Sequence, residues 1–200
     1  MSLSEKEKML RGELYDASDE ELRNERRRAK SLCHAYNQSH PESVQEREQL
    51  LNSLLGSSKG RCFIEPAFHC DYGYNIHLGE NFYSNHDLVI LDVCEVRIGA
   101  NCLLGPRVCI ITATHPIAPK ERLSGLEYGE PITIGDNVWI GAGAILNPGI
   151  SVGDNAIIAS GSVVTKDVKA NMIVGGVPAR EFKEVEQGTA VNEPKDDQDD

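Results

Sequence analysis

The chain has 200 residues, of which 40% are hydrophobic and 26% are charged, with a formal net charge of -11 at pH 7. This length suits one globular domain with an appendage. The acidic charge argues against nucleic acid or an anionic membrane as partner, because phosphate groups attract basic surfaces. The first residues hold no apolar signal-peptide core, and no apolar run reaches the ~18 residues of a membrane span. We therefore expect a cytoplasmic protein.

Residues 1–57 are predicted to form a helical N-terminal extension. The stretch Ser18–Glu21 looks like a capping box, and it is followed at helical spacing by Leu22, Ala29, Leu32, Cys33 and Tyr36. A second helix is expected to begin near Pro41, which the first turn of a helix tolerates, and to end at Gly56. The basic run at residues 23–30 is interpreted as a solvated helix face paired with glutamates, with phosphate binding as the alternative.

From about Ile64 the composition changes and a repeat emerges. An aliphatic residue recurs at every sixth position, at Ile134, Ile140, Leu146, Val152, Ile158 and Val164. The same register holds at Ile98, Leu104 and Ile110, and related sets that begin at Ile64 and Leu78 are offset from it. A period of six fits short strands joined by tight corners, with one aliphatic side chain per strand pointing inward. Three such units make one coil, so residues 58–185 are predicted to form a β-solenoid of about five coils.

The segment 112–131 interrupts this repeat. It shows no six-residue pattern, although Ile110 before it and Ile134 after it keep one register. Long loops in compact domains are usually functional, and insertions in solenoids map to the binding face. His115 opens the segment, where a side chain is both fixed by a rigid strand and accessible. Because imidazole is a natural general base near neutral pH, we predict a protruding loop with a catalytic His115.

Cysteines and the C-terminal tail suggest no further site. The six cysteines are not spaced C-x-x-C and lie mostly in apolar surroundings, so we expect buried, reduced thiols. Residues 186–200 are strongly acidic with little to bury, and we expect them to form a disordered, solubilising tail.

Four stretches together carry a resemblance to a known family. They are DYGYN at 71–75, TATHP at 112–116, VGGVPAR at 174–180 and the helical opening KMLRGELYDASDEELRNERRRAKSLCHAYN. In combination they resemble the hexapeptide-repeat sugar O-acetyltransferases, above all the maltose, galactoside and nodulation acetyltransferases. The resemblance implies a mainly β fold, a left-handed parallel β-helix with an N-terminal α-helical segment and a protruding loop. Rules for ordinary β-crossovers would have predicted the opposite hand.

The resemblance also implies an activity. An acetyl group would pass from acetyl-CoA, the cosubstrate, to a hydroxyl of a sugar such as maltose or glucose, with the 6-hydroxyl favoured. Transfer would be direct, within a ternary complex, with His115 as general base and with no metal required. The site would lie between adjacent subunits of a homotrimer.

Residue roles follow from the same resemblance, position by position. Asn85 is expected to hold the acceptor or the transition state beside His115. The sugar site is expected to be lined by Asp16, Asp71, Tyr83 and Asp92. Binding of CoA is expected from Trp139, Ala142, Ser160, Thr165, Lys166, Arg180 and Lys183. The family often has serine at Ala142 and arginine at Lys183, but a main-chain N–H at Ala142 still suits an oxyanion.

Three alternatives stay open at this point. The first is another acceptor for the same chemistry, namely a galactoside, an amine, a drug or serine. The second is a carbonic anhydrase of the γ class, which needs three histidines converging on one zinc; His69, His77 and His86 are not equivalently spaced for this. The third is a non-catalytic solenoid scaffold that uses the loop as a docking surface.

Overall fold

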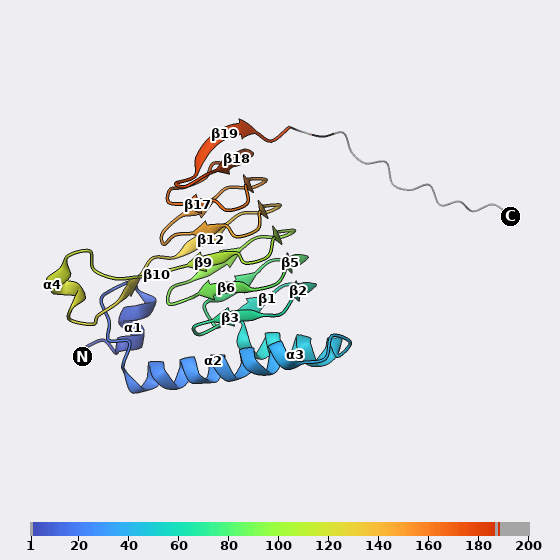
Figure 1. Ribbon diagram of the computed structural model, residues 1–200. Coiled ribbons are helices and arrows are strands. Elements are labelled where there is room, and N and C mark those ends of the chain that lie inside the picture. The colour runs from blue at the N-terminus through green and yellow to red at the C-terminus, as the bar shows by residue number, and fades with distance from the viewer. Residues whose placement is uncertain (1, 187, 189–200) are drawn as a thin grey trace.

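The computed structural model describes residues 2–186 and 188 (Figure 1). Three N-terminal helices, α1 (Glu5–Leu10), α2 (Glu20–Gln38) and α3 (Val44–Leu54), precede a stack of short strands. In Figure 1, α2 and α3 lie across the lower end of the stack and α1 lies beside it. The predicted disordered tail, 186–200, falls almost entirely outside the described residues.

The strands form three parallel sheets, which the chain visits in turn. The first sheet contains β1 (Ser57–Ser58), β4 (Ile76–Leu78), β7 (Val96–Ile98), β12 (Ile132–Ile134) and β15 (Ser151–Val152). The second contains β2 (Cys62–Ile64), β5 (Phe82–Ser84), β8 (Leu103–Leu104), β13 (Trp139–Ile140), β16 (Ile157–Ile158), β18 (Met172–Gly175) and the antiparallel β19 (Arg180–Glu184). The third contains β3 (Phe68–Cys70), β6 (Leu88–Leu91), β9 (Cys109–Ile111), β14 (Ile145–Leu146) and β17 (Val163–Val164). This is the predicted β-solenoid, with five complete turns and a partial sixth, which begins where Val168 pairs with Val152 and continues in β18.

The six-residue repeat corresponds to columns of buried side chains. Ile140 aligns with Leu104 below it and with Ile158 above it, and all three are at most 1% exposed. Leu146 aligns in the same way with Ile110 and Val164 in the third sheet. Burial of one such side chain contributes about 1.5–3 kcal/mol, so the predicted inward positions are confirmed as the core.

Departures from the six-residue spacing occur at one corner of the solenoid. We call the links from the third sheet back to the first the third-to-first corner, and the links from the second sheet to the third the second-to-third corner. At the third-to-first corner the spacing is eight residues from Cys70 to Leu78 and from Ile90 to Ile98, and 24 from Ile110 to Ile134. The two-residue offset in the sequence pattern therefore marks a real feature, a longer link on one side of the molecule.

The remaining corner, from the first sheet to the second, carries a ladder of asparagines. The ladder consists of Asn81, Asn101, Asn137, Asn155 and Asn171, all with φ between 56° and 59°. The side-chain amide of each of the first four donates to the amide oxygen of the next, at 2.9–3.1 Å. Asparagine tolerates this left-handed conformation better than most residues. One residue type therefore provides both the backbone bend at the corner and the hydrogen bond that joins one turn of the solenoid to the next.

The helices close the lower end of the stack. The amide of Asn37 donates to the Phe68 carbonyl at 3.0 Å and accepts from the Phe68 N–H at 2.8 Å, so that it replaces a missing neighbouring strand. Tyr36 donates to the carbonyl of Ile64 in the same way. Satisfying these edge groups prevents further strand pairing at that end. All six cysteines are free, and four are buried as predicted, whereas Cys62 and Cys109 are only partly buried.

Asn137→Ala tests the ladder. The change removes two amide bonds and places alanine in a left-handed conformation, so the free energy of unfolding should fall by about 1–3 kcal/mol. Asn137→Gly, which removes the bonds without the backbone strain, should lose less. Denaturation in urea measures both effects, with Asn24→Ala on the exposed face of α2 as control; an Asn137→Ala protein as stable as that control would contradict the ladder's role.

Candidate active site

The interrupting segment, residues 112–131, is an ordered arm rather than an irregular loop. It contains an antiparallel pair, β10 (Ala113–Thr114) with β11 (Tyr128–Gly129), and a short helix, α4 (Pro119–Arg122). Thr112 is fully buried at the root of the arm. Its hydroxyl donates to the Leu91 carbonyl at 2.7 Å and accepts from the Cys94 N–H at 3.0 Å. The arm therefore leaves the third-to-first corner from a fixed point.

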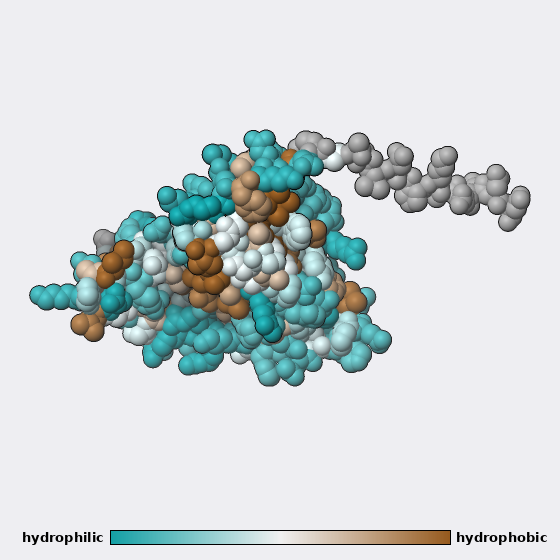
Figure 2. Space-filling model, turned by 45° about the horizontal axis from the view of Figure 1, so that its top comes forward, coloured by the Kyte–Doolittle hydropathy of each residue, from teal (hydrophilic) through white to brown (hydrophobic). Residues whose placement is uncertain are grey.

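His115 follows β10 directly and is exposed. The next residues, Pro116 and Ile117, line an open groove together with Gly12 and Leu14 of the N-terminal extension. In Figure 1 the arm projects on the same side of the molecule as α1, and Figure 2 shows brown apolar side chains on its outer part. His115 thus lies at the root of the arm, directly before the residues that line this groove, and its catalytic role stays a prediction.

The N-terminal extension is bonded to the arm. Tyr15 and Glu127 exchange backbone hydrogen bonds of 2.9 and 3.1 Å, and the Tyr15 hydroxyl donates to the Glu127 carboxylate at 3.1 Å. Gly12 lies against the carbonyl of Gly129, where an added Cβ would approach that oxygen to 2.7 Å. Glycine is needed at position 12 for this approach and for its φ of 72°. The extension and the arm therefore form one wall of the site.

Asp92 lies in the same corner but does not reach its surface. Its side chain is 0% exposed, and its carboxylate accepts from the N–H groups of Asp71, Tyr72 and Gly73 at 2.7–3.0 Å. Burial raises the pKa of Asp92 to about 7, although the three N–H donors act in the opposite direction. We expected Asp92 to line the sugar site, but its carboxylate is buried and does not reach the surface of the corner. It accepts hydrogen bonds from three backbone N–H groups instead, and thereby positions Asp71.

Asp71 and Asp16 are the predicted carboxylates that remain accessible. Asp71 is half-buried at the start of the third-to-first corner, and burial raises its pKa while the nearby Arg26 lowers it. Asp16 is exposed in the segment before α2, and hydrogen bonds from Ser18 lower its pKa. His115 and Glu127 lie at or beside the same corner, and we name these four residues the acceptor half-site for their proposed role.

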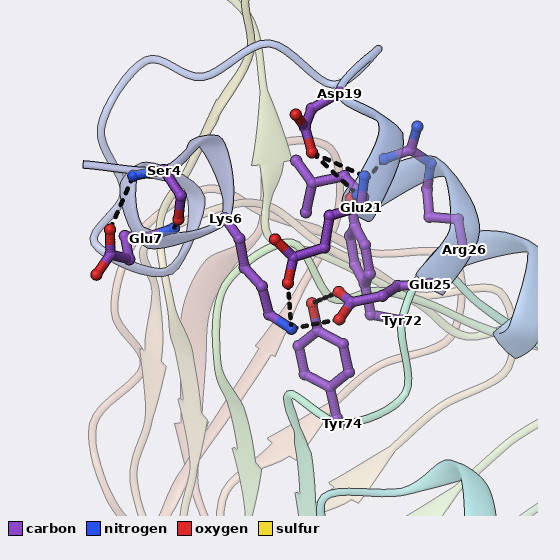
Figure 3. A network of polar contacts seen from close by, with 10 residues as sticks. Ser4, Lys6, Glu7, Asp19, Glu21, Glu25, Arg26, Tyr72 and Tyr74 are labelled. Atoms are coloured by element: carbon purple, nitrogen blue, oxygen red, sulfur yellow. Dashed lines mark hydrogen bonds and ion pairs between the residues drawn. The ribbon is translucent and has the colours of Figure 1, made fainter. Parts of the chain in front are cut away.

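A polar network holds the extension against the first turn (Figure 3). Arg26 on α2 donates to the Tyr72 hydroxyl at 2.5 Å, and the Tyr74 hydroxyl donates to Glu25 at 2.8 Å. Lys6 on α1 pairs with Glu25 and lies 5.0 Å from the ring centre of Tyr74. Tyr72 and Tyr74 follow Asp71 within three residues. Their contacts therefore hold α1 and α2 against the segment that carries the Asp71 carboxylate.

A second group of predicted residues lies at the second-to-third corner. Asn85 follows β5, Ala142 follows β13 and Ser160 follows β16, so they occupy the second, fourth and fifth turns of this corner. Within the described chain, the N–H groups of Ala142 and Ser160 donate to no other backbone group. Tyr83 and Trp139 lie beside this corner on the outer face of the second sheet, in register with Leu103 between them. We name these five residues and Leu103 the donor half-site for their proposed role. Within one chain, Tyr83 and Asn85 therefore lie apart from Asp71 and His115, with which they were expected to bind the acceptor.

The predicted cationic residues lie higher on the stack. Thr165 and Lys166 follow β17 and are exposed at the third-to-first corner, two turns above the arm. Arg180 and Lys183 are exposed on β19, where Lys183 pairs with Glu186 at 2.7 Å. Thr165 and Lys166 thus lie on a different corner from Ala142 and Ser160, so one chain does not bring all the predicted CoA-binding residues together.

The two half-sites of one chain do not meet. The second-to-third and third-to-first corners lie at opposite ends of the third sheet, so Asn85 and His115 are separated by one side of the solenoid. A side of about six extended residues spans roughly 20 Å at 3.3 Å per residue, too far for both residues to contact one reacting group. One chain therefore does not bring Asn85 and His115 together.

The other histidines do not form a metal site. His69 and His77 lie in the third and first sheets, and His86 lies at the second-to-third corner. Among residues 2–186 and 188, no group of three or more His, Cys, Asp or Glu side chains is placed to hold a metal ion. No described helix is both long and apolar enough to cross a bilayer.

Sequence reasoning missed Glu127, Tyr15 and Thr112. Glu127 and Tyr15 are 112 residues apart, and only the antiparallel pairing of extension and arm brings them together. Glu127 lies in the LEYGEP stretch of the insertion, so it could have been predicted from the sequence. A carboxylate in a binding loop is a candidate for contact with the substrate.

Comparison with known proteins agrees with this architecture. Residues 8–60 match the maltose acetyltransferase hexapeptide capping motif. Residues 131–166 match the bacterial transferase hexapeptide with six repeats, and residues 95–117 match the hexapeptide repeat of succinyl-transferase.

Individual relatives span almost the whole chain. The galactoside O-acetyltransferase of Escherichia coli K12 is 40% identical over 92% of this chain and 91% of its own. The crystal structure of a maltose O-acetyltransferase from Clostridium difficile 630 is 49% identical, with a TM-score of 0.91 over 94% of this chain and 100% of that one. A galactoside acetyltransferase in complex with coenzyme A is 39% identical, with a TM-score of 0.89 over 92% of each chain.

Titration of Asp92 provides a test of its buried position. The pKa of Asp92 is about 7 in the folded protein, whereas an unfolded aspartate has a pKa of about 3.9. Between about pH 4 and pH 7 the unfolded chain has released this proton while the folded chain still holds it. The free energy of unfolding should therefore decrease with rising pH in this window, by up to about 1.4 kcal/mol per pH unit.

The matched comparison is Asp92→Asn, which has no titrating group at this position. The difference in free energy of unfolding, wild type minus variant, should decrease from pH 4 to pH 7 and then level off. Urea denaturation at half-unit pH intervals measures it, and parallel curves for the two proteins would contradict the burial of a titrating Asp92.

Proposed function

The chain belongs to the maltose and galactoside O-acetyltransferase family of hexapeptide-repeat proteins, and from this premise we propose that it transfers the acetyl group of acetyl-CoA to a sugar hydroxyl. The proposed acceptor is a sugar such as maltose or glucose, at its 6-hydroxyl, and the proposed general base is His115. One observation carries the proposal: an exposed histidine stands at the root of the arm, in the same corner as Asp71 and next to the groove between arm and extension.

His115 performs the proton transfer in this scheme. Its imidazole takes the proton of the acceptor hydroxyl as the hydroxyl oxygen attacks the acetyl carbonyl carbon. The C–S bond of the thioester then breaks, and the thiolate of CoA takes a proton back from the imidazolium. The exposure of His115 and the fixed root at Thr112 support this role, since a base must be both accessible and oriented.

The acceptor half-site binds the sugar. Carboxylates accept hydrogen bonds from hydroxyls. Burial and the charge of the nearby Glu127 raise the pKa of Asp71, and Asp16 is exposed on the extension. Asp92 fixes Asp71 through the backbone bonds at residues 71–73. The runner-up acceptors are a galactoside, an amine, a drug or serine, and thiol release from acetyl-CoA in the presence of each one distinguishes them from maltose and glucose.

The donor half-site binds acetyl-CoA. The free N–H of Ala142 is a candidate donor to the oxyanion, and Asn85 stands two turns below it on the same corner. Trp139, 54% exposed, offers a flat surface to the pantetheine arm. Lys166, Arg180 and Lys183 are the cations available for the phosphates, which lets a chain of net charge -11 bind an anionic cosubstrate.

A homotrimer completes the site. The separation of the two corners in one chain supports a site made from His115 of one subunit and Asn85 of the next. The apolar side chains on the outer second sheet, Leu103 and Trp139, are 51% and 54% exposed, and Ile117 on the arm is 88% exposed. Surfaces of this kind suit contact with another subunit.

His115→Ala tests the base. The variant should lose about 10²–10⁴-fold in acetyl transfer to maltose and glucose, because general-base catalysis contributes this much. Thiol release measures the rate, and binding of CoA, together with an unchanged circular dichroism spectrum, serves as the control for folding. Transfer near the wild-type rate would exclude His115 as the base.

Mixing two inactive variants tests the shared site. His115→Ala and Asn85→Ala are each expected to be nearly inactive, but co-assembled trimers restore sites in which both residues are intact. With random 1:1 assembly about a quarter of the sites are complete, so about 25% of wild-type activity should return. If both residues served one site from the same chain, the mixture would stay as inactive as its components.

A further inference from the structure

A cavity at the lower end of the β-helix is remote from the acceptor half-site. It has a volume of ≈ 280 Å³ and lies between α3, the end of α2 and β2. Its apolar wall is formed by Pro41, Val44, Leu51, Cys62 and Phe63. The proposed function uses none of these residues.

Arg47 is the buried polar group of this cavity. Only 7% of Arg47 is exposed, and its guanidinium lies 5.1 and 5.6 Å from the ring centres of Tyr36 and Phe63. Its Nη2 donates to the Tyr36 hydroxyl at 3.4 Å and to the Ile64 carbonyl at 3.3 Å. The buried Nε has no hydrogen-bond partner among the described residues. The guanidinium is thus held in place by rings but is only partly satisfied.

The positive charge of Arg47 also lacks a counter-ion. Within residues 2–186 and 188, no carboxylate lies within 4.0 Å of it, including that of Glu48, which lines the same cavity. The lining contains two arginines, Arg47 and Arg61, against this one glutamate, so its formal charge is +1. A buried, unpaired cation is strongly unfavourable, and an anion in the cavity would offset this.

We propose that this cavity binds a small organic monoanion, a carboxylate attached to a flat apolar group. The carboxylate would accept from the guanidinium of Arg47, and the apolar body would lie between Val44, Leu51 and Phe63. Since a water molecule occupies about 30 Å³, the volume limits the ligand to roughly ten non-hydrogen atoms. The ligand contacts both the helical extension and the first turn, so it stabilises their association.

Benzoate is a suitable probe because it combines these two features at the right size. Isothermal titration of the full-length protein should show saturable binding of benzoate, together with a rise in Tm. Benzamide, which has the same shape but no charge, should bind at least about ten-fold more weakly, because it loses the charge-assisted hydrogen bond. Binding of CoA measured in parallel keeps this result independent of the acetyltransferase activity.

Three variants locate the site. Arg47→Met keeps the aliphatic stem but removes the charge, and should lose benzoate binding by at least about ten-fold. Arg27→Met, at an exposed arginine of α2, is the matched control and should bind as wild type does. Val44→Trp fills the mouth of the cavity and should also abolish binding, which keeps the test decisive if Arg47→Met fails to fold.

Three outcomes would overturn the proposal. They are the absence of saturable benzoate binding to wild type up to about 10 mM, undiminished binding in a folded Arg47→Met or Val44→Trp protein, and equal affinity for benzamide. The last would leave an apolar cavity without selectivity for anions.

Discussion

The alignment of inward side chains between turns is the constraint on which the structure depends. Most strands contribute a buried apolar residue that must lie directly over its counterpart, as Ile140 lies between Leu104 and Ile158. A slip of one residue would turn the apolar side chain outward, so the spacing within and between strands is held at six. Extra residues are accommodated at the third-to-first corner, because a link there can lengthen without displacing a column.

The residues of the proposed site are divided between the regular corner of the solenoid and the corner whose links vary in length. The longer links carry Asp71, Asp92 and the arm with His115, while the regular second-to-third corner presents Asn85, Ala142 and Ser160 on its second, fourth and fifth turns. Hydrogen bonds from backbone N–H groups to the Asp92 carboxylate and to the Thr112 hydroxyl hold the longer links of the third-to-first corner in place against the stack. The extension then closes the corner through Tyr15 and the network around Tyr72 and Tyr74 (Figure 3).

Much of this could be predicted from the sequence because the repeat is local. The six-residue period placed Ile98 to Val164 in the core, and the break in it located the arm and His115. The period does not say which corner a residue occupies, so the separation of Asn85 from His115 came only from the structure. Burial of Asp92 and pairing of Tyr15 with Glu127 depend on contacts between distant segments, which no local pattern records.

The length of the arm has a further consequence. Ile110 and Ile134 are 24 residues apart where six is usual, so the arm adds eighteen residues, the length of one regular turn. The ladder shows the same relation, since Asn101 and Asn137 are 36 residues apart and yet directly bonded, as are Asn137 and Asn155 at 18. The arm can thus change in length and composition during evolution while the stack keeps its register, which lets substrate preference diverge independently of folding.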